Sequence, residues 1–396
     1  MLFLLISVVI FGTVFGYCGW RLIGPAQLTD LAAIAAWAAL FVLASMTHVY
    51  HMVLRDSKLK PGLADLVAWV AYTSLAWVAL TFPLLVLRDL GWLLFLGASK
   101  LFAHPLTANL DSEKVVFVLQ ATNLGIVIIS TITTGLGMYQ ARRRPRVVEV
   151  TVPIRNLDPA LHGFRIVQIC DIHVGPTIKE KFVAAVVETV NELQPDLVAV
   201  VGDLADGPVE QLRPHVAPLG ELRSRHGSFF VTGNHDYYSG VTEWVAEARR
   251  LGMDVLLNEN RLIEHGDGRL VVAGVTDYTA VKEALPGSLA KHWHDPEAAV
   301  SETPADAPRI LLAHQPRSLT AALKAGFDLM LCGHTHGGQL IPWNFIVPLQ
   351  QPFLAGLHEV GDSSWIYVSR GTGYWGPPVR VNAPSEVTCI TLVPKI

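Results

Sequence analysis

Residues 165–173 read RIVQICDIH, a short apolar run that ends in an aspartate and a histidine. The run predicts a buried strand over residues 165–170. Alternate side chains of an extended segment point the same way, so Asp171 and His173 can hold one ion together. Four later segments repeat this pattern of an apolar strand followed by Asp, Asn or His: LVAVVGDLAD (197–206), FFVTGNHD (229–236), ILLAHQP (310–316) and LMLCGHTHGGQ (329–339).

Helical patterns separate these predicted strands. Amphipathic stretches cover residues 179–193, 209–223 and 242–251, and further strands are expected at 270–274, 365–368 and 387–392. Strands that alternate with helices predict an α/β fold. Ligands of such sheets bind at the carboxyl ends of the strands, so we expect the polar residues that follow the strands to meet in one crevice.

Carboxylates and imidazoles gathered in one crevice need cations among them, because like charges repel and buried polar groups otherwise lack partners. A mixture of oxygen and imidazole ligands suits Mn, Fe or Zn better than Ca. The donors suffice for two divalent transition-metal ions, whose identity the sequence leaves open. Taken singly, each motif has a plainer interpretation: Gly233-Asn234 is a common turn, and a lone His314 is more often a core histidine.

In their order along the chain, the five blocks resemble the signature of the calcineurin-like metallophosphoesterase superfamily. The GHTHGGQ segment and the later Arg370-Gly371-Thr372-Gly373 look like its membrane-anchored branch, which includes UDP-2,3-diacylglucosamine pyrophosphohydrolases. The resemblance implies an α/β sandwich of two mixed sheets flanked by helices, over residues 161–396. It also implies a dinuclear metal-dependent hydrolase that cleaves a phosphate ester or pyrophosphate by a metal-bridging hydroxide.

The resemblance also assigns roles to individual residues. One metal would be held by Asp171, His173 and His336, and the second by Asn234, His314 and His334. Asp203 would bridge both ions. His235 would lie near the leaving group as a catalytic acid, and Asp236 would orient it. Asp206 and Gly207 are expected to shape the loop and not to bind metal.

The first 140 residues are different in character. Hydrophobic residues make up 51% of the whole chain and charged residues 16%, and the deficit of charge is concentrated there. Four runs reach the ~20 residues that a helix needs to cross a bilayer, and they cover residues 2–23, 30–50, 63–86 and 116–138. A shorter run, 91–102, is predicted to lie at the membrane interface. Residues 141–160 are predicted to be a basic juxtamembrane linker.

The basic residues predict an orientation. Seven of them lie on one side of the predicted spans and four on the other. The richer side carries Arg55, Lys58, Lys60, Arg142, Arg143, Arg144 and Arg146. Because basic loops stay in the cytoplasm, we expect an inner-membrane protein with a cytoplasmic catalytic domain.

Composition also excludes some partners. A net charge of −4 without a basic patch argues against nucleic-acid binding. Four widely spaced cysteines argue against a disulfide framework. The oligomeric state stays open.

Two apolar segments near the predicted site bear on the substrate. They contain Trp343, Phe345, Ile346, Phe353 and Leu354 in one stretch, and Tyr374 and Trp375 in another. They either form a lip that enters the headgroup layer and admits a lipid-linked phosphate, or they pack in the core. An alternative function gives the helices the main role, as a transporter or sensor with an accessory hydrolase. The few charges within the spans argue against transport.

Overall fold

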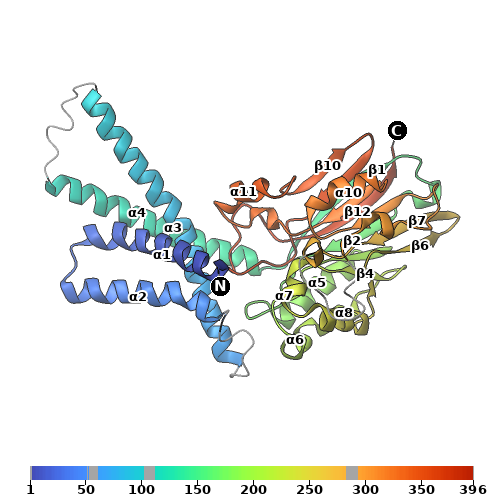
Figure 1. Ribbon diagram of the computed structural model, residues 1–396, viewed down its shortest axis with the longest axis horizontal. Helices are drawn as coiled ribbons and strands as arrows, with labels where there is room; N and C mark the ends of the chain where they lie inside the picture. The colour runs from blue at the N-terminus through green and yellow to red at the C-terminus, as the bar shows by residue number, and fades with distance from the viewer. Residues whose placement is uncertain (1, 51, 53–60, 102–111, 282–292, 396) are drawn as a thin grey trace. The chain divides into compact units, whose positions relative to one another are not determined.

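The computed structural model describes residues 2–50, 52, 61–101, 112–281 and 293–395 (Figure 1). It divides into two compact units. One comprises the chain up to residue 139 together with 376–379, and the other comprises 140–375 with 380–396. Arg55, Lys58 and Lys60, which contribute to the predicted orientation, lie outside the described residues.

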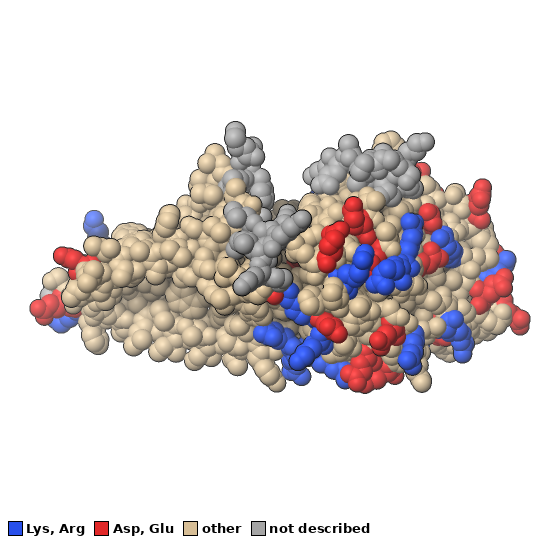
Figure 2. Space-filling model, turned by 90° about the horizontal axis from the view of Figure 1, so that it is seen from below, with Lys and Arg blue, Asp and Glu red and all other residues tan. Residues whose placement is uncertain are grey.

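The first unit is built of long apolar helices. They are α1 (Leu2–Ile23), α2 (Asp30–Val49), α3 (Pro61–Leu101) and α4 (Ser112–Arg142), of which the last three residues lie in the second unit. Among the described residues, four helices are long and apolar enough to cross a membrane, which agrees with the predicted four spans. Large side chains such as Leu31, Phe41 and Leu94 are more than 70% exposed. On the face shown in Figure 2, charged side chains are sparse over these helices. Such a surface suits a hydrocarbon solvent.

Helix α3 differs from the prediction. Residues 63–86 were expected to span and 91–102 to lie at the interface, yet one helix of 41 residues runs through both and ends at Leu101. At 1.5 Å per residue it is about 60 Å long, roughly twice the bilayer core. The charged pair Arg88-Asp89 does not interrupt it, because Asp89 accepts hydrogen bonds from the hydroxyl of Tyr17 (2.6 Å) and the guanidinium of Arg21 (2.7 Å) on α1.

The second unit contains two six-stranded mixed sheets, as the resemblance implies. The first has the order β1-β12-β2-β3-β4-β5 and the second β10-β11-β9-β8-β7-β6. The first sheet comprises β1 (Arg146–Ile154), β2 (Arg165–Ile169), β3 (Leu197–Val201), β4 (Ser228–Val231), β5 (Asp254–Val255) and β12 (Glu386–Pro394). The second comprises β6 (Glu259–His265), β7 (Gly268–Gly274), β8 (Arg309–Leu312), β9 (Leu329–Cys332), β10 (Gly356–Val360) and β11 (Ser364–Val368).

Buried apolar clusters lie between the two sheets and on the outer face of each sheet. Ile166, Leu197 and Phe229 of the first sheet pack in one buried cluster with Leu270 and Ile310 of the second. Helices α5 (Glu180–Glu192), α6 (Val209–Val216) and α8 (Val241–Arg250) cover the outer face of the first sheet (Figure 1). Helices α9 (Pro296–Ala299) and α10 (Leu319–Lys324) cover the second. The result is a four-layer sandwich.

The segment predicted to be a linker, 141–160, contains strand β1. This strand pairs in parallel with β12 from Arg146 to Ile154, so it is part of the first sheet. Ahead of it, Arg144 donates hydrogen bonds to Thr189 and Glu192 of α5, both at 2.6 Å. Only residues 143–145 separate α4 from the strand.

Candidate metal centre

The predicted ligands all lie just beyond the ends of strands. Asp171 and His173 follow β2, Asp203 follows β3, and Asn234 and His235 begin α7 (Asn234–Tyr238) after β4. From the second sheet, His314 follows β8, and His334 and His336 follow β9. Strands β2, β3 and β4 are parallel neighbours, as are β8 and β9. Parallel neighbours deliver their carboxyl ends to one edge of each sheet, and the two edges meet at these side chains.

Within the described residues, three groups of donor atoms lie close enough together to hold a metal ion. They are Asp171, His173 and His336; His173, Asp203 and His235; and Asp203, His314 and His334. In each group the ligand atoms lie within 4.8 Å of one another. Consecutive groups share His173 or Asp203. The first group has the same three residues as the first ligand set expected from the resemblance. The third contains His314 and His334 of the second expected set, together with Asp203 in place of Asn234.

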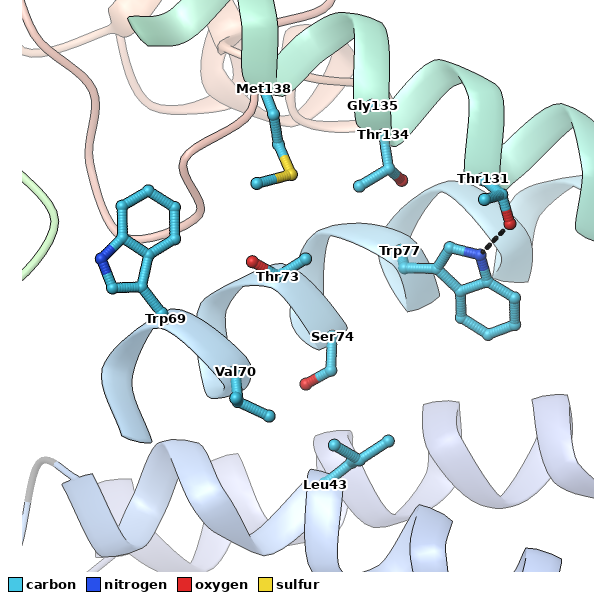
Figure 3. A pocket seen from close by; sticks show the side chains of 10 residues that line it. All are labelled: Leu43, Trp69, Val70, Thr73, Ser74, Trp77, Thr131, Thr134, Gly135 and Met138. Atoms are coloured by element: carbon cyan, nitrogen blue, oxygen red, sulfur yellow. Dashed lines mark hydrogen bonds between the residues drawn. The ribbon is translucent and has the colours of Figure 1, made fainter. Parts of the chain in front are cut away.

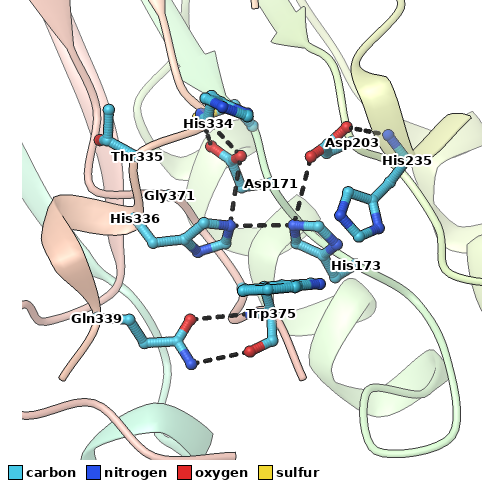
Figure 4. Close-up of polar contacts among 12 residues, drawn as sticks. Asp171, His173, Asp203, His235, His334, Thr335, His336, Gln339, Gly371 and Trp375 are labelled. Carbon is cyan, nitrogen blue, oxygen red and sulfur yellow. Dashed lines mark hydrogen bonds and ion pairs between the residues drawn. The ribbon is translucent and has the colours of Figure 1, made fainter. Parts of the chain in front are cut away.

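The individual distances are short (Figure 4). His173 Nε2 lies 3.0 Å from His336 Nε2 and 3.6 Å from Asp203 Oδ2. His336 Nε2 lies 3.5 Å from Asp171 Oδ1. On the other side of Asp203, its Oδ2 is 3.1 Å from His314 Nε2.

Contacts behind the ligands fix which ring nitrogen carries hydrogen. His314 Nδ1 lies 2.9 Å from the carbonyl oxygen of Val201, which can only accept, so Nδ1 donates. His173 Nδ1 faces Asp206 Oδ1 at 3.1 Å and donates likewise. In the neutral rings this leaves both Nε2 lone pairs directed at the centre. Carbonyl or carboxylate partners of this kind are usual behind metal-binding histidines.

Two buried polar atoms here have no hydrogen-bond partner among the described residues: Asn234 Oδ1 and His314 Nε2. Asn234 Oδ1 is an acceptor, and His314 Nε2 faces a carboxylate oxygen of Asp203. Burial lowers the pKa of His314, but Asp203 more than offsets it and raises it well above the usual range, so the space between these two atoms attracts a proton or another cation. A buried acceptor without a donor is costly. A cation placed between these atoms satisfies them, so the residues fit a pair of divalent metals.

Backbone strain is concentrated at the same residues. Five of the seven predicted ligands have φ in the left-handed region, between 52° and 71°: Asp171, His173, Asp203, His334 and His336. Residues other than glycine rarely adopt this backbone conformation, and each one that does raises the free energy of the folded state. Strain gathered at one cluster of polar side chains indicates a functional arrangement that the surrounding sandwich maintains.

Glycines allow the loops to approach the carboxylates. A Cβ at Gly333 would collide with Asp171 Oδ2, and one at Gly233 with Asp203 Oδ1. Asp171 Oδ1 and Oδ2 accept from the backbone N–H of His334 at 2.9 and 3.1 Å, which requires the close approach at Gly333.

Gly333→Ala is expected to displace Asp171 or the loop of His334. It should therefore weaken metal binding by about tenfold or more, since a loss of about 1.4 kcal/mol of binding free energy has that effect. Isothermal titration with Mn²⁺ measures the change. Gly220→Ala is the matched control, because its Cβ would meet only ordinary contacts with Leu251. Unchanged Mn²⁺ affinity in Gly333→Ala would show that this approach is not needed.

The residue that orients His235 is Asp206 and not the predicted Asp236. Asp206 Oδ1 lies 2.7 Å from His235 Nδ1 and also contacts His173. Asp236 instead accepts backbone N–H groups of Gly233 (2.7 Å), Leu204 (2.9 Å) and Asp203 (3.0 Å). Its carboxylate is therefore occupied in joining the loops after β3 and β4. Asp206 belongs to none of the three donor groups, and its carboxylate contacts two histidines instead.

The histidines of the site differ in the direction in which their pKa values are shifted. Burial lowers the pKa of His334 to about 3 and also holds the pKa of His336 well below its usual range, so both rings are neutral at pH 7. Burial also lowers the pKa of His235, but Asp206 and Asp203 more than offset it and raise it to about 9. Burial opposes the charge of Asp203, yet attraction by His314 and His235 keeps its pKa well below the usual range.

Sequence reasoning missed Arg380, a fully buried cation behind the centre. Its guanidinium donates to the carbonyl oxygens of Gly373 (2.6 Å), Ala383 (2.7 Å) and His336 (3.2 Å), and it lies 3.2 Å from His336 Nδ1. It thus joins the RGTG segment to the loop of His336. Its position in a loop far along the chain gives no local signal of this role.

The two apolar segments that the sequence places near the site, here called the rim segments, are partly exposed. Helix α11 (Trp343–Ile346) contains Trp343, 46% exposed, and Phe345, 68% exposed. Trp375 is 49% exposed, and its ring lies edge-on to His235 with centroids 5.9 Å apart. Gln339 fixes Trp375 by two hydrogen bonds of 2.9 Å to its backbone (Figure 4). Tyr374, in contrast, is buried, and Phe353 packs against the outer core of the second sheet.

Comparison with known proteins supports this geometry. A family model described as calcineurin-like phosphoesterase matches residues 164–338. A transmembrane protein with metallophosphoesterase domain from Bos taurus is 41% identical over 275 residues, covering 67% of this chain and 61% of that protein. Its counterpart from Danio rerio is 39% identical over 272 residues, with the same two coverages. An uncharacterised metallophosphoesterase of Campylobacter jejuni is 35% identical over 274 residues, covering 69% of this chain and 70% of that protein.

This chain thus spans 61% of the length of the two vertebrate relatives. The region matched by the family model contains every residue of the three donor groups, together with Asn234 and Asp206. Sheet order, strand-end ligands and sequence identity all point to one family. The chain belongs to the calcineurin-like metallophosphoesterases.

Proposed function

We propose that the protein hydrolyses a phosphate ester or pyrophosphate bond with two divalent metal ions. The observation that carries this proposal is that the three donor groups are adjacent and share His173 and Asp203. One ion would be held by Asp171, His173 and His336, and the other by Asn234, His314 and His334, with Asp203 shared. When bound, two such ions lower the pKa of a shared water and neutralise phosphoryl charge.

The chain's own residues supply the rest of the chemistry. His235 Nδ1 is held by Asp206 at 2.7 Å, which directs Nε2 away from that carboxylate. With a pKa of about 9 in the metal-free geometry, the ring carries a proton at neutral pH that it can give to a leaving oxygen. The backbone N–H of His235 donates to Asp203 Oδ1 at 2.8 Å, which ties the acid to the shared carboxylate.

Hydrolysis is tested with purified protein, loaded with Mn²⁺ and offered monoesters, diesters and pyrophosphates. We expect turnover of one class that depends on added metal and is lost with a chelator. Chelator-insensitive hydrolysis, or the absence of turnover on all three classes at full metal occupancy, would refute the assignment.

We further propose that the substrate is lipid-linked, for example UDP-2,3-diacylglucosamine. Trp343, Phe345 and Leu349 expose large apolar surfaces on one segment, and Trp375 exposes another beside His235. Exposed aromatic rings favour the headgroup region of a bilayer. The same chain carries helices that are long and apolar enough to cross a membrane.

Trp343→Ala is expected to raise KM for the diacylated substrate in vesicles by about tenfold, since it removes apolar area worth more than ~1.4 kcal/mol. Its KM for a short-chain soluble phosphoester is expected to stay unchanged. Trp293→Ala is the matched control, because Trp293 is 66% exposed and lies outside the two rim segments. Equal kinetics of Trp343→Ala and the parent on both substrates would rule out the lipid-facing rim.

For its location we propose the inner membrane, with the catalytic unit on the cytoplasmic side. The basic residues at 142–146 support this side. A fluorescent protein that matures only in the cytoplasm, fused to the C-terminus, is expected to fluoresce. Active alkaline phosphatase in the equivalent fusion would place the domain on the opposite side.

A further inference from the structure

The helical unit has an open groove of about 640 Å³ between three of its helices (Figure 3). Leu43 of α2 forms one wall. The second is formed by five residues of α3 and the third by four residues of α4: Trp69, Val70, Thr73, Ser74 and Trp77, and Thr131, Thr134, Gly135 and Met138. Met138 lies at the same end as Trp69, and Thr131 lies beside Trp77 at the other end (Figure 3). We call this space the helical groove.

Several polar groups in the walls of the helical groove already have protein partners. Ser74 donates its hydroxyl hydrogen to the carbonyl of Ala71 (2.8 Å), and Thr134 donates to that of Ser130 (2.7 Å). Trp77 Nε1 donates to Thr131 Oγ1 at 3.1 Å. The groove therefore offers little to water or a polar solute, which need several polar partners.

The size and direction of the groove match a hydrocarbon chain. From Trp69 to Trp77 it follows α3 over eight residues, or about 12 Å. Its Met138 end lies one turn before α4 ends at Arg142, near the end of a helix that is long enough to span a bilayer. Around such helices the solvent is lipid, and an empty apolar space would forfeit dispersion contacts that an inserted chain restores.

We propose that the helical groove binds one acyl chain of a membrane lipid, which enters from the Met138 end and reaches Trp77 and Thr131. This assigns the helices a ligand of their own, beyond anchoring, and it does not depend on the phosphoesterase activity. The occupant is hydrocarbon because the walls are apolar. The transporter alternative requires a polar solute in the groove. The hydroxyls of Ser74 and Thr134 already donate to backbone carbonyls, so their hydrogens are not available to such a solute.

Glycines of α4 permit a matched test. A Cβ at Gly135 would meet nothing within 4 Å, and Gly135 lines the groove, so Gly135→Leu extends an apolar side chain from a position with open space. Gly125 also has open space at its Cβ but does not line the groove, which makes Gly125→Leu the control for the same chemical change on the same helix.

The experiment uses full-length protein in nanodiscs that contain phosphatidylcholine with a photoreactive diazirine in one acyl chain. In the parent, cross-links are expected to be enriched on the groove residues Thr73, Ser74, Thr134 and Met138 over outward-facing Leu31, Phe41 and Leu94. Gly135→Leu should lower this groove labelling about tenfold, as a loss of 1.4 kcal/mol in binding would, whereas Gly125→Leu should leave it unchanged. Unchanged circular dichroism and melting temperature of both variants in the same nanodiscs check that each is folded.

Labelling that is equal on groove and outward-facing positions would overturn the proposal, because it is the result expected of surrounding bulk lipid. Groove labelling that persists in Gly135→Leu would overturn it as well.

Discussion

Asp203→Asn is expected to lower kcat for phosphoester hydrolysis by about 10³-fold or more, since several kcal/mol of metal-derived stabilisation are lost and each 1.36 kcal/mol is tenfold. Asp203 is the carboxylate next to both ligand sets, with Oδ2 3.1 Å from His314 Nε2 and 3.6 Å from His173 Nε2. Asparagine keeps the shape and can still accept the backbone N–H of His235. It removes the charge that two cations would share.

Metal analysis by mass spectrometry accompanies the kinetics. We expect the parent to hold two ions per chain and Asp203→Asn to hold at most one, with little change in melting temperature. Asp306→Asn is the control, since Asp306 is exposed and pairs only with Arg269 at 2.8 Å among the described residues. If Asp203→Asn hydrolysed substrate at the parental rate, the shared carboxylate would be misassigned.

His235→Gln is expected to lower kcat by about 10²–10⁴-fold, the usual contribution of a well-placed general acid, while both metals stay bound. His235 lies in the middle donor group with His173 and Asp203, so its ring could in principle serve as a ligand. Its Nδ1 is engaged by Asp206, and its side chain is partly open at the rim. Metal content therefore separates the two roles: loss of an ion in His235→Gln would make it a ligand and not the acid.

The pH profile provides a second readout for His235. Burial lowers its pKa, but Asp206 and Asp203 raise it to about 9, above the ordinary value for histidine. The protonated acid is thus present at low pH and is lost as pH rises through that value. Bound cations would lower the pKa, so the alkaline limb of kcat is expected at or below pH 9. His235→Gln should lack this limb, and His265→Gln should keep it.

Much of the sandwich could be predicted from the sequence, because its central strands are buried on both faces. LVAVV and LMLC form β3 and β9 with the predicted boundaries, since continuous apolar runs are typical of such strands. The strands that sequence reasoning missed lie at the edges of the sheets. β1, β6 and β10 mix polar and apolar residues and are half-exposed, so their sequences resemble loops as closely as strands.

The donor groups could be anticipated because each ligand directly follows a recognisable strand. The contacts behind them could not. Asp206 lies three residues after Asp203, yet only the path of α7 brings His235 to its carboxylate. Arg380 meets His336 from a loop more than 40 residues away. These roles depend on how loops cross in three dimensions, which strand patterns do not encode.

Helix α3 shows a similar limit in the membrane region. Arg88 and Asp89 interrupt the apolar run, so hydropathy divides it into a span and a shorter interfacial piece. The structure keeps one helix because Tyr17 and Arg21 of α1 satisfy Asp89. A charged residue that is hydrogen-bonded to a neighbouring helix can therefore lie within a long apolar helix without ending it.

Anomalous diffraction from crystals of the Mn²⁺-loaded protein tests the two-metal centre most directly. We expect two peaks about 3.5–4 Å apart, one in contact with Asp171, His173 and His336 and the other with Asn234, His314 and His334. Asp203 should touch both. A single ion, or ions that leave Asp203 and His336 without a metal contact, would contradict the proposed centre.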